Sequence, residues 1–459
     1  MEAPRPSDSP RDDPRAATPA DPSPRQAYAK KTVWAWALYD FANSAFTTLV
    51  VTFVYATYFA QALVLDSSGV AVDGSPLWST GLSVTALLVA VLSPFLGALA
   101  DRTGSRRSFL LTSTAVCIAA TTGLFFPVPG QALAALALFV VANVAFELSN
   151  VFYNSFLPDI APPDKIGRIS GNGWALGYAG GLIALVIALV VFVQPETAPF
   201  GLDRATGAHV RATCLLVAAW FAVFSVPAFL ALKDERPSAP APSAGAILRT
   251  TAAELSSTFR DLRRYRDAFR FLVARIFFSD GLNTIFALGG VYAGITFGFT
   301  IPEVITFGIA LNVAAGLGAF GFGFVDDRLG GKRTILISIV LLTAATTLAV
   351  FAPGRTEFWI AGILIGLAAG PNQAASRSLV GRFSPPDKET EFYGFFALTG
   401  KAASLFGPLL FAALTTAFGT QRAGVASILV FFVVGGLLLL RVDERQGVAA
   451  SGRDGTSPQ

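Results

Sequence analysis

The sequence predicts an all-α membrane protein in which twelve transmembrane helices form two pseudo-symmetric six-helix halves. Of the 459 residues, 53% are hydrophobic and 14% are charged, and the mean hydropathy is +0.59. A soluble protein of ordinary composition is far less apolar. Apolar segments of membrane-spanning length recur along the chain, and several polar motifs of its first half return in its second half. These observations place the chain in a lipid bilayer.

Each apolar segment is close to the roughly 20 residues that cross a hydrocarbon core about 30 Å thick. A backbone in lipid has to satisfy its own hydrogen bonds, so we expect every segment to be an α-helix. The predicted spans are residues 32–64, 77–100, 108–126, 131–157, 172–194, 213–232, 269–297, 304–325, 335–352, 358–380, 392–417 and 424–440.

The residue types that form metal centres and hydrolytic sites are scarce. Cys117 and Cys214 lie within predicted spans and match no metal-ligand or disulfide spacing. The single histidine, His209, has no Cys, Asp or Glu beside it at ligand spacing. The sequence also lacks the GxxxxGK[ST] phosphate-binding motif. We therefore expect no enzyme activity, no metal and no cofactor.

Basic residues are distributed unevenly between the two sides of the predicted membrane. If the N-terminus is cytoplasmic, about two dozen Lys and Arg fall in inner loops and tails, against Arg204, Arg211, Arg355 and Arg422 outside. Such residues orient a membrane protein, so the pI of about 9.1 does not call for a nucleic-acid partner. The asymmetry predicts a multi-pass protein of the bacterial inner membrane with both termini in the cytoplasm.

Polar segments flank and divide the predicted bundle. Residues 1–29 are rich in Pro, Asp, Arg and Ala and lack the apolar core of a signal peptide, so we expect a disordered tail. The N-terminal half, residues 30–232, is followed by a linker, residues 233–268, with a Pro/Ala/Ser stretch and a basic amphipathic helix. The C-terminal half covers residues 269–441, and we expect a second disordered tail over residues 442–459.

Three motifs occur once in each half and in the same order. The loop GALADRTGSRR (97–107) returns as GFVDDRLGGKR (323–333), and PPDK occurs at 162–165 and again at 385–388. The first predicted helix carries Asp40 and Asn43, and the seventh carries Asp280 and Asn283. This repetition indicates that the two halves are structural repeats.

A repeated twelve-helix architecture with these two loops resembles the major facilitator superfamily. The first loop matches the superfamily's signature at Gly97, Leu99, Asp101, Arg102, Gly104, Arg106 and Arg107. In the second copy Val325 replaces the leucine, while Asp327, Arg328, Gly330, Lys332 and Arg333 are kept. The resemblance implies the major facilitator fold.

A narrower resemblance covers nearly all of the chain after the first tail. The strings WALYDFANSAF (36–46), FYNSFLPDI (152–160), SGNGWALGYAGG (170–181), SDGLNTIFALGGVYA (279–293), QAASRS (373–378) and FALTGKAASLFGP (396–408) are similar to the branch of autophagy-related vacuolar amino-acid effluxers and their bacterial relatives. This resemblance implies efflux of amino acids.

Two acids at matching places in the repeats are the leading candidates for coupling or substrate binding. At 1.5 Å per residue, Asp40 lies about 12 Å into the first helix and Asp280 about 16 Å into the seventh. Charged groups at this depth line a cavity or pair with one another, and they usually mark function. With Asn43 and Asn283 they could bind substrate or exchange a proton. The alternative is that Asp40 bonds Asn43 and fixes helix packing.

Two further charged residues are predicted near the membrane centre. Glu147 lies about 15 Å from the inner end of the fourth helix, and Lys401 about 13 Å into the eleventh. Gly370 occupies the position that corresponds to Glu147 in the second half. The long stem of Lys401 could place its amine at the inner surface, or the amine could contact substrate or a carboxylate.

The residues near the inner ends of the helices are gating candidates. In the resembled superfamily the acid of the signature loop sits at the start of the eleventh helix, a part that Asp101 would take here. Arg377 lies about 5 Å from the inner end of the tenth helix, so we expect it to pair with Asp327 at the inner gate. The full set of predicted gating residues is Asp101, Arg102, Arg106, Asp327, Arg328 and Arg377.

Uncharged polar groups on the fourth and tenth helices could serve a zwitterionic substrate or bond neighbouring helices. They are Asn150, Tyr153, Asn154 and Gln373. We therefore expect a monomeric secondary transporter that moves a small polar metabolite, an amino acid, outward by alternating access against a proton or another coupling ion. The alternatives are a membrane receptor or scaffold that does not transport, and a lipid scramblase.

Overall fold

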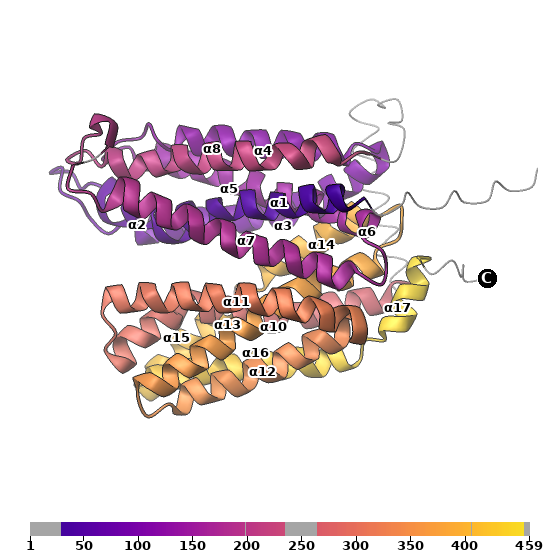
Figure 1. Ribbon diagram of the computed structural model, residues 1–459. Helices are drawn as coiled ribbons and strands as arrows, with labels where there is room; N and C mark the ends of the chain where they lie inside the picture. Colours follow the sequence, from indigo (N-terminus) through magenta and orange to yellow (C-terminus); the bar gives the residue numbers. More distant parts are fainter. Residues whose placement is uncertain (1–28, 198, 235–263, 405, 454–459) are drawn as a thin grey trace, which may run out of the picture.

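The computed structural model describes residues 29–197, 199–234, 264–404 and 406–453. The predicted N-terminal tail and the amphipathic helix of the linker fall almost wholly outside these ranges. Figure 1 shows an elongated bundle in which the first helix begins, and the last helix ends, at the same end of the molecule. We call this end the terminal face and the other end the far face.

The N-terminal half contains six membrane-length helical segments. The first is built from α1 (Lys30–Ala45), the π-helical segments η1 (Phe46–Phe53) and η2 (Phe59–Leu63), and the short α2 (Tyr55–Tyr58) between them. The others are α3 (Ser75–Thr103), α4 (Arg106–Gly123), α5 (Ala132–Ser155) with α6 (Leu157–Ile160), α7 (Ile166–Ile187) with η3 (Ala188–Val193), and α8 (Ala208–Ala231).

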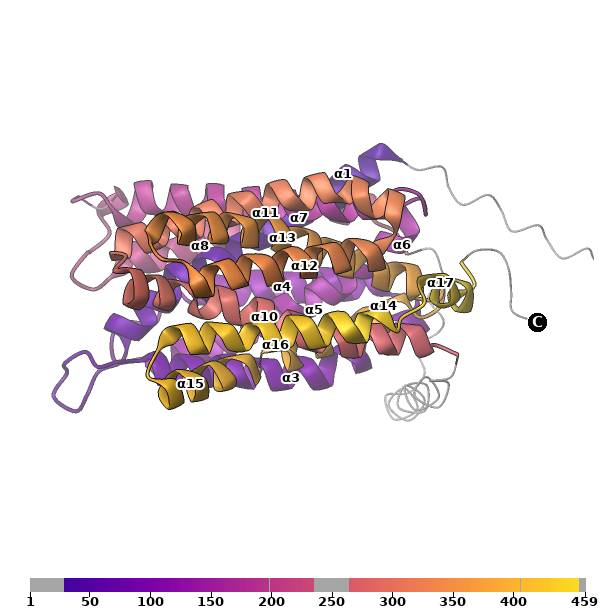
Figure 2. The same ribbon diagram turned by 90° about the horizontal axis from the view of Figure 1, so that it is seen from below.

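The C-terminal half repeats the arrangement with six more segments. They are α10 (Arg266–Phe297), α11 (Ile301–Leu329), α12 (Gly331–Phe351), α13 (Arg355–Phe383), α14 (Glu389–Ala402) with α15 (Phe406–Phe418), and α16 (Gln421–Leu440). A further short helix, α17 (Glu444–Ser451), lies at the terminal face beyond α16, as Figure 2 shows.

These helices confirm the twelve predicted spans. In the described part of the chain, eleven segments are long and apolar enough to cross a membrane. The twelfth is α4, whose sequence RRSFLLTSTAVCIAATTG is less apolar because it opens with two arginines and carries many hydroxyl groups.

The structure corrects two predictions about the second half. The eleventh span was expected to be one helix over residues 392–417, but it is divided into α14 and α15. Residues 442–453, expected to be part of a disordered tail, instead contain α17, whose N-cap Asp443 accepts a hydrogen bond from the Gln446 N–H.

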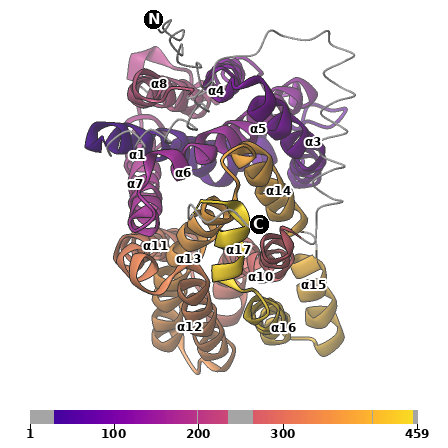
Figure 3. The same ribbon diagram turned by 90° about the vertical axis from the view of Figure 1, so that its right-hand side faces the viewer.

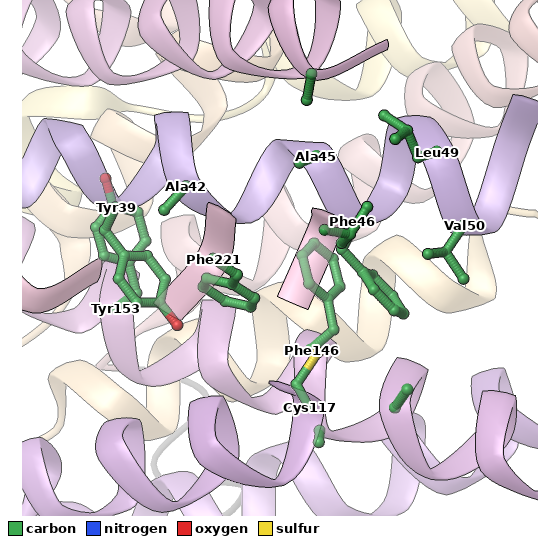
Figure 4. Close-up of a cluster of buried hydrophobic side chains, with 14 of the residues drawn as sticks. Tyr39, Ala42, Ala45, Phe46, Leu49, Val50, Cys117, Phe146, Tyr153 and Phe221 are labelled. Carbon is green, nitrogen blue, oxygen red and sulfur yellow. The ribbon is translucent and has the colours of Figure 1, made fainter. Parts of the chain in front are cut away.

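Aromatic packing forms much of the core of the N-terminal half. Tyr39 stacks on Tyr153 with ring centroids 4.7 Å apart, and Phe46 stacks on Phe146 at 5.0 Å. Figure 4 shows these rings between the first segment and α5, with Cys117 beside them. Offset stacking and burial of such rings stabilise the association of α1 with α5.

The two halves meet along α3, α5 and α7 on one side and α11, α13 and α14 on the other. Figure 3, seen from the terminal face, shows α14 beside α3 and α5, and α7 beside α11. Glycines permit the closest approach, because a Cβ at Gly97 would lie 2.5 Å from the Thr390 carbonyl oxygen and one at Gly394 2.5 Å from that of Ser93. Small residues at such crossings let helix backbones pack tightly in a membrane.

Candidate functional site

A cavity of about 910 Å³ lies between the two halves. Its wall includes Thr47, Thr48 and Val51–Phe53 of the first segment, Trp174 and Tyr178 of α7, and Asn283–Tyr292 and Gly294 of α10. The α11 residues that line it belong to the first half of that helix, which starts at the far face. The cavity therefore occupies the half of the bundle away from the terminal face.

The cavity wall is apolar and aromatic with a few uncharged polar groups, and none of its described residues is charged. The polar side chains in this wall include Thr47, Thr48, Tyr178, Asn283, Asn312 and Gln373. The part of the first segment that lines the cavity is the π-helical η1. π-Helical turns are frequent at functional sites. This wall suits a ligand without net charge.

Of the polar residues predicted for the cavity, Gln373 lines it and accepts a hydrogen bond from the Tyr178 hydroxyl at 2.9 Å. The other three lie outside the wall. Asn150 accepts a bond from Asn43 at 3.1 Å, Asn154 contacts Arg377, and Tyr153 packs within the aromatic core. Interhelical hydrogen bonding, the alternative to ligand contact, therefore describes Asn150 and Asn154 in this conformation, whereas Tyr153 contributes ring packing.

Below the cavity, toward the terminal face, Arg377 of α13 binds Asp40 of α1. The Arg377 Nη1 lies 2.7 Å from the Asp40 Oδ2, and the two side chains are 3% and 11% exposed. Arg377 also donates to the Ser170 hydroxyl at 3.0 Å and to the Ser170 carbonyl at 2.6 Å. These bonds offset the cost of burying both charges, which a bare pair would not do.

The local sequence makes room for this pair. Gly173 of α7 faces it, and a Cβ there would lie 2.6 Å from the Asp40 Oδ2 and 2.8 Å from the Arg377 Nη2. The guanidinium also lies over the Trp36 ring, 4.8 Å from its centroid. Arg377 was expected to pair with Asp327, a prediction that is wrong because Arg377 binds Asp40 and Ser170 while Asp327 pairs with Arg168 of α7.

A second ion pair joins the halves through α5 and α14. The Lys401 Nζ lies 2.5 Å from the Glu147 Oε1, with side chains 25% and 23% exposed. The structure thereby decides between the two orientations left open for Lys401: its amine contacts a carboxylate. Neither residue lines the cavity.

Asp280 has a different environment from Asp40. Its carboxylate accepts hydrogen bonds from the backbone N–H groups of Phe406 at 3.1 Å and Gly407 at 3.0 Å, at the start of α15. An acid at this position satisfies unpaired N–H groups and complements the helix dipole. Asn283 bonds the nearby Ser404 hydroxyl at 3.0 Å, which ties α10 to the break between α14 and α15.

Contrary to our expectation, neither Asp40 nor Asp280 lines the cavity in this conformation. Asp40 is held below it by Arg377, and Asp280 is turned into the helix break. A smaller adjacent cavity of about 110 Å³ is lined by Thr47 and by Ser44, whose hydroxyl donates to the backbone carbonyl of Asp40 in the preceding helical turn.

The two signature loops cap helices of the opposite half. The Asp101 carboxylate accepts from the N–H groups of Thr390 at 3.1 Å and Glu391 at 2.8 Å, in the first turn of α14. Asp327 accepts from the Arg168 N–H at 3.1 Å and pairs with its Nε at 2.9 Å, in the first turn of α7. Asp101 thus occupies the position at the eleventh helix that the resemblance implies.

The remaining gating candidates differ in environment. Arg106 pairs with Asp159 at 2.7 Å, whereas Arg102 is half-buried at the end of α3. Arg328 is exposed at the end of α11 and forms no ion pair within the described part of the chain. In the second loop Asp326 forms an additional ion pair with Arg382 of α13 at 2.6 Å.

Sequence reasoning missed one half-buried cation within a span. Arg275 of α10 donates to the Phe396 carbonyl at 2.6 Å and the Thr399 hydroxyl at 2.9 Å, and lies 3.5 Å from the Phe396 ring centroid. Its position ten residues into an apolar helix was a sufficient signal, because intramembrane arginines are rare.

Comparison with known proteins identifies the family. A model of the family described as "Vacuole effluxer Atg22 like" matches residues 28–452. The chain belongs to this family. Its curated relatives include the "Uncharacterized MFS-type transporter YxiO" of Bacillus subtilis (strain 168), 29% identical over 92% of this chain and 97% of that protein. They also include "Autophagy-related protein 22" of Coccidioides immitis (strain RS), 24% identical over 79% of this chain and 71% of that protein.

Solved structures share the fold. The transporter FucP in the outward conformation aligns with a TM-score of 0.68 at 13% identity, covering 90% of this chain and 98% of that chain. The human organic anion transporter MFSD10 aligns with a TM-score of 0.67 at 16% identity, covering 89% and 99%. The family and the fold together identify the Atg22-like chain as a transporter of the major facilitator superfamily and not as an enzyme.

Proposed function

We propose that this protein is a secondary transporter that exports a neutral amino acid by alternating access, driven by a proton gradient. The observation that carries the proposal is a cavity open toward one face and closed toward the other by ion pairs between the halves. A carrier needs such a site between its repeats. A scaffold has no need of these buried charges.

The orientation follows from the basic residues. The terminal face carries the large majority of Lys and Arg in the loops, which supports a cytoplasmic position for both termini. The far face is then extracytoplasmic, and the conformation described here is open to the outside. In this state a substrate would leave the cell through the cavity.

The cavity wall supports a substrate without net charge. A zwitterionic amino acid can place its apolar side chain against Phe307 or Phe411 and its polar groups against Asn283, Asn312 or Gln373. The name of the matching family, vacuole effluxer, supports solute transport as the role of the cavity.

Coupling is proposed to use carboxylates that lose their partners when the terminal face opens. Asp40 and Arg377 come from different halves, as do Glu147 and Lys401. Protonation from the outer side neutralises such an acid and weakens its ion pair, which favours separation of the halves at the terminal face. The acid then meets cytoplasmic water and releases the proton there, so that proton entry is exchanged for substrate export.

Flux in proteoliposomes tests the proposal. Purified protein is assayed with labelled neutral amino acids with and without an imposed pH gradient. We expect gradient-dependent flux that Asp40→Asn and Glu147→Gln abolish while the protein stays folded, and that the exposed loop variant Asp164→Asn leaves unchanged. Unaltered flux in both ion-pair variants would refute their coupling role. Lipid movement that ignores the gradient would indicate a scramblase, and absence of any flux a scaffold.

A further inference from the structure

The segment that follows the last transmembrane helix is fixed to the C-terminal half. The Glu444 carboxylate accepts hydrogen bonds from the N–H groups of Gly331 and Lys332, both at 2.9 Å, and so caps the start of α12. The Asp443 N–H donates to Asp267 of α10 at 2.9 Å. These contacts place α17 across the terminal face, with its end directed toward the interface between the halves, as Figure 3 shows.

At that end, the Arg453 side chain contacts both halves. In the C-terminal half its Nη2 lies 2.6 Å from the Glu389 Oε1, and its Nε donates to the Ser384 carbonyl at 2.6 Å. In the N-terminal half its Nη1 donates to the Pro158 carbonyl at 3.4 Å and lies 3.9 Å from the Asp159 Oδ1. The side chain is only 9% exposed, so a residue near the chain end is built into the closed face.

The charges around Arg453 explain why it is needed there. Asp159 belongs to α6 of the N-terminal half and Glu389 to the start of α14, and their side chains are 14% and 3% exposed. Arg106 lies 2.7 Å from Asp159 but 3.9 Å from Glu389. Without Arg453, two buried acids on opposite halves would share one arginine, and their repulsion would favour separation of the halves.

We propose that Arg453 is a gating residue that holds the terminal face closed by neutralising Glu389 and Asp159 across the interface. The proposal rests on the alternating access proposed above. Opening of this face requires the end of α17 to release Asp159, so the C-terminal segment sets the balance between the two states of the carrier.

Cysteine accessibility behind the closed face measures this balance directly. Ala374 is 3% exposed on α13, and its carbonyl accepts a hydrogen bond from the Ser170 hydroxyl of α7 across the interface. In full-length protein with Cys117 and Cys214 replaced by alanine, Ala374→Cys is treated with an impermeant maleimide from the terminal face. In a separate aliquot of the same vesicles, protease cleavage of the C-terminal segment shows that the terminal face is on the outside. The modification rate follows the population in which the face is open.

We expect Arg453→Gln to raise this rate by about tenfold or more, because removing one partner of a buried ion pair is strongly destabilising. Arg445→Gln, which removes an exposed charge on α17, should leave the rate unchanged. Adding Glu389→Gln to Arg453→Gln should return the rate toward that of the parent, because one repelling acid is gone. A rate within twofold of the parent in Arg453→Gln, or no reversal by Glu389→Gln, overturns the proposal. Thermal unfolding of each variant checks that it is folded. The modification rate is measured without substrate, so it can support or contradict the role of Arg453 even if the protein shows no amino-acid flux.

Discussion

Asp40 and Asp280 occupy the same place in the two repeats, yet Asp40 binds the opposite half and Asp280 binds its own. The partner positions account for the difference. Arg377 precedes the second PPDK motif by the same eight residues as Asn154 precedes the first. Asp40 therefore faces an arginine across the interface, and the corresponding residue available to Asp280 is a neutral asparagine.

The helices beside the two acids differ as well. Gly407, at the break between α14 and α15, corresponds to Ala184, which lies inside the continuous helix α7. Only the broken helix offers free backbone N–H groups, and Asp280 takes them. By contrast, Asp101 and Asp327 keep the same role in both halves, because each meets the intact N-terminus of a helix. Corresponding residues of the two halves keep the same role only where the groups that they contact also correspond.

Breaking the inter-half pair should have the largest effect. Arg377→Ala leaves Asp40 buried and without a cation, so we expect a loss of about 3–5 kcal/mol in the free energy of unfolding and loss of transport. Thermal unfolding in detergent and flux in proteoliposomes measure the two effects. The double variant Asp40→Asn with Arg377→Gln should recover most of the stability. If Arg377→Ala alone is as stable as the parent, the ion pair with Arg377 does not account for the difference between Asp40 and Asp280.

Removing the cap within the C-terminal half should cost less. Asp280→Ala deprives α15 of its acceptor, and the loss of an N-terminal cap is worth about 1–2 kcal/mol. Asp280→Asn keeps one acceptor oxygen and should retain about half of the stability lost in Asp280→Ala. Thermal unfolding ranks the three proteins. If both variants were as stable as the parent, Asp280 would not act as a cap, and this difference between Asp280 and Asp40 would be removed.

The smallest effect is expected at the cavity wall. Gln373→Ala removes one uncharged hydrogen-bonding group, worth about 0.5–1.5 kcal/mol, so the substrate Kd should rise by roughly two- to tenfold with little change in stability. Binding is measured by titration of the transported amino acid. A matched control is Ser338→Ala, a buried hydroxyl outside the wall. An unchanged Kd for Gln373→Ala would remove Gln373 from the site.

The sequence by itself determined what depends on local composition and on repetition. Hydropathy found the spans because each is long and all but α4 are strongly apolar, and repeated motifs found the two halves. The depth of Asp40, Glu147 and Lys401 was also readable, since the rise per residue of a helix is fixed. The resemblance of the signature loop placed Asp101 against the eleventh helix.

The tertiary structure decided which charges meet. The partners Asp40 and Arg377 are separated by 337 residues, and Lys401 and Glu147 by 254. No local sequence pattern fixes which faces of helices from the two halves meet. The depth of a charged residue along its helix therefore indicated a place inside the bundle but not the partner of its side chain. The break in the eleventh span and the docking of Arg453 likewise arise from contacts between distant segments, because an acid on another helix caps the break and acids of both halves hold the arginine.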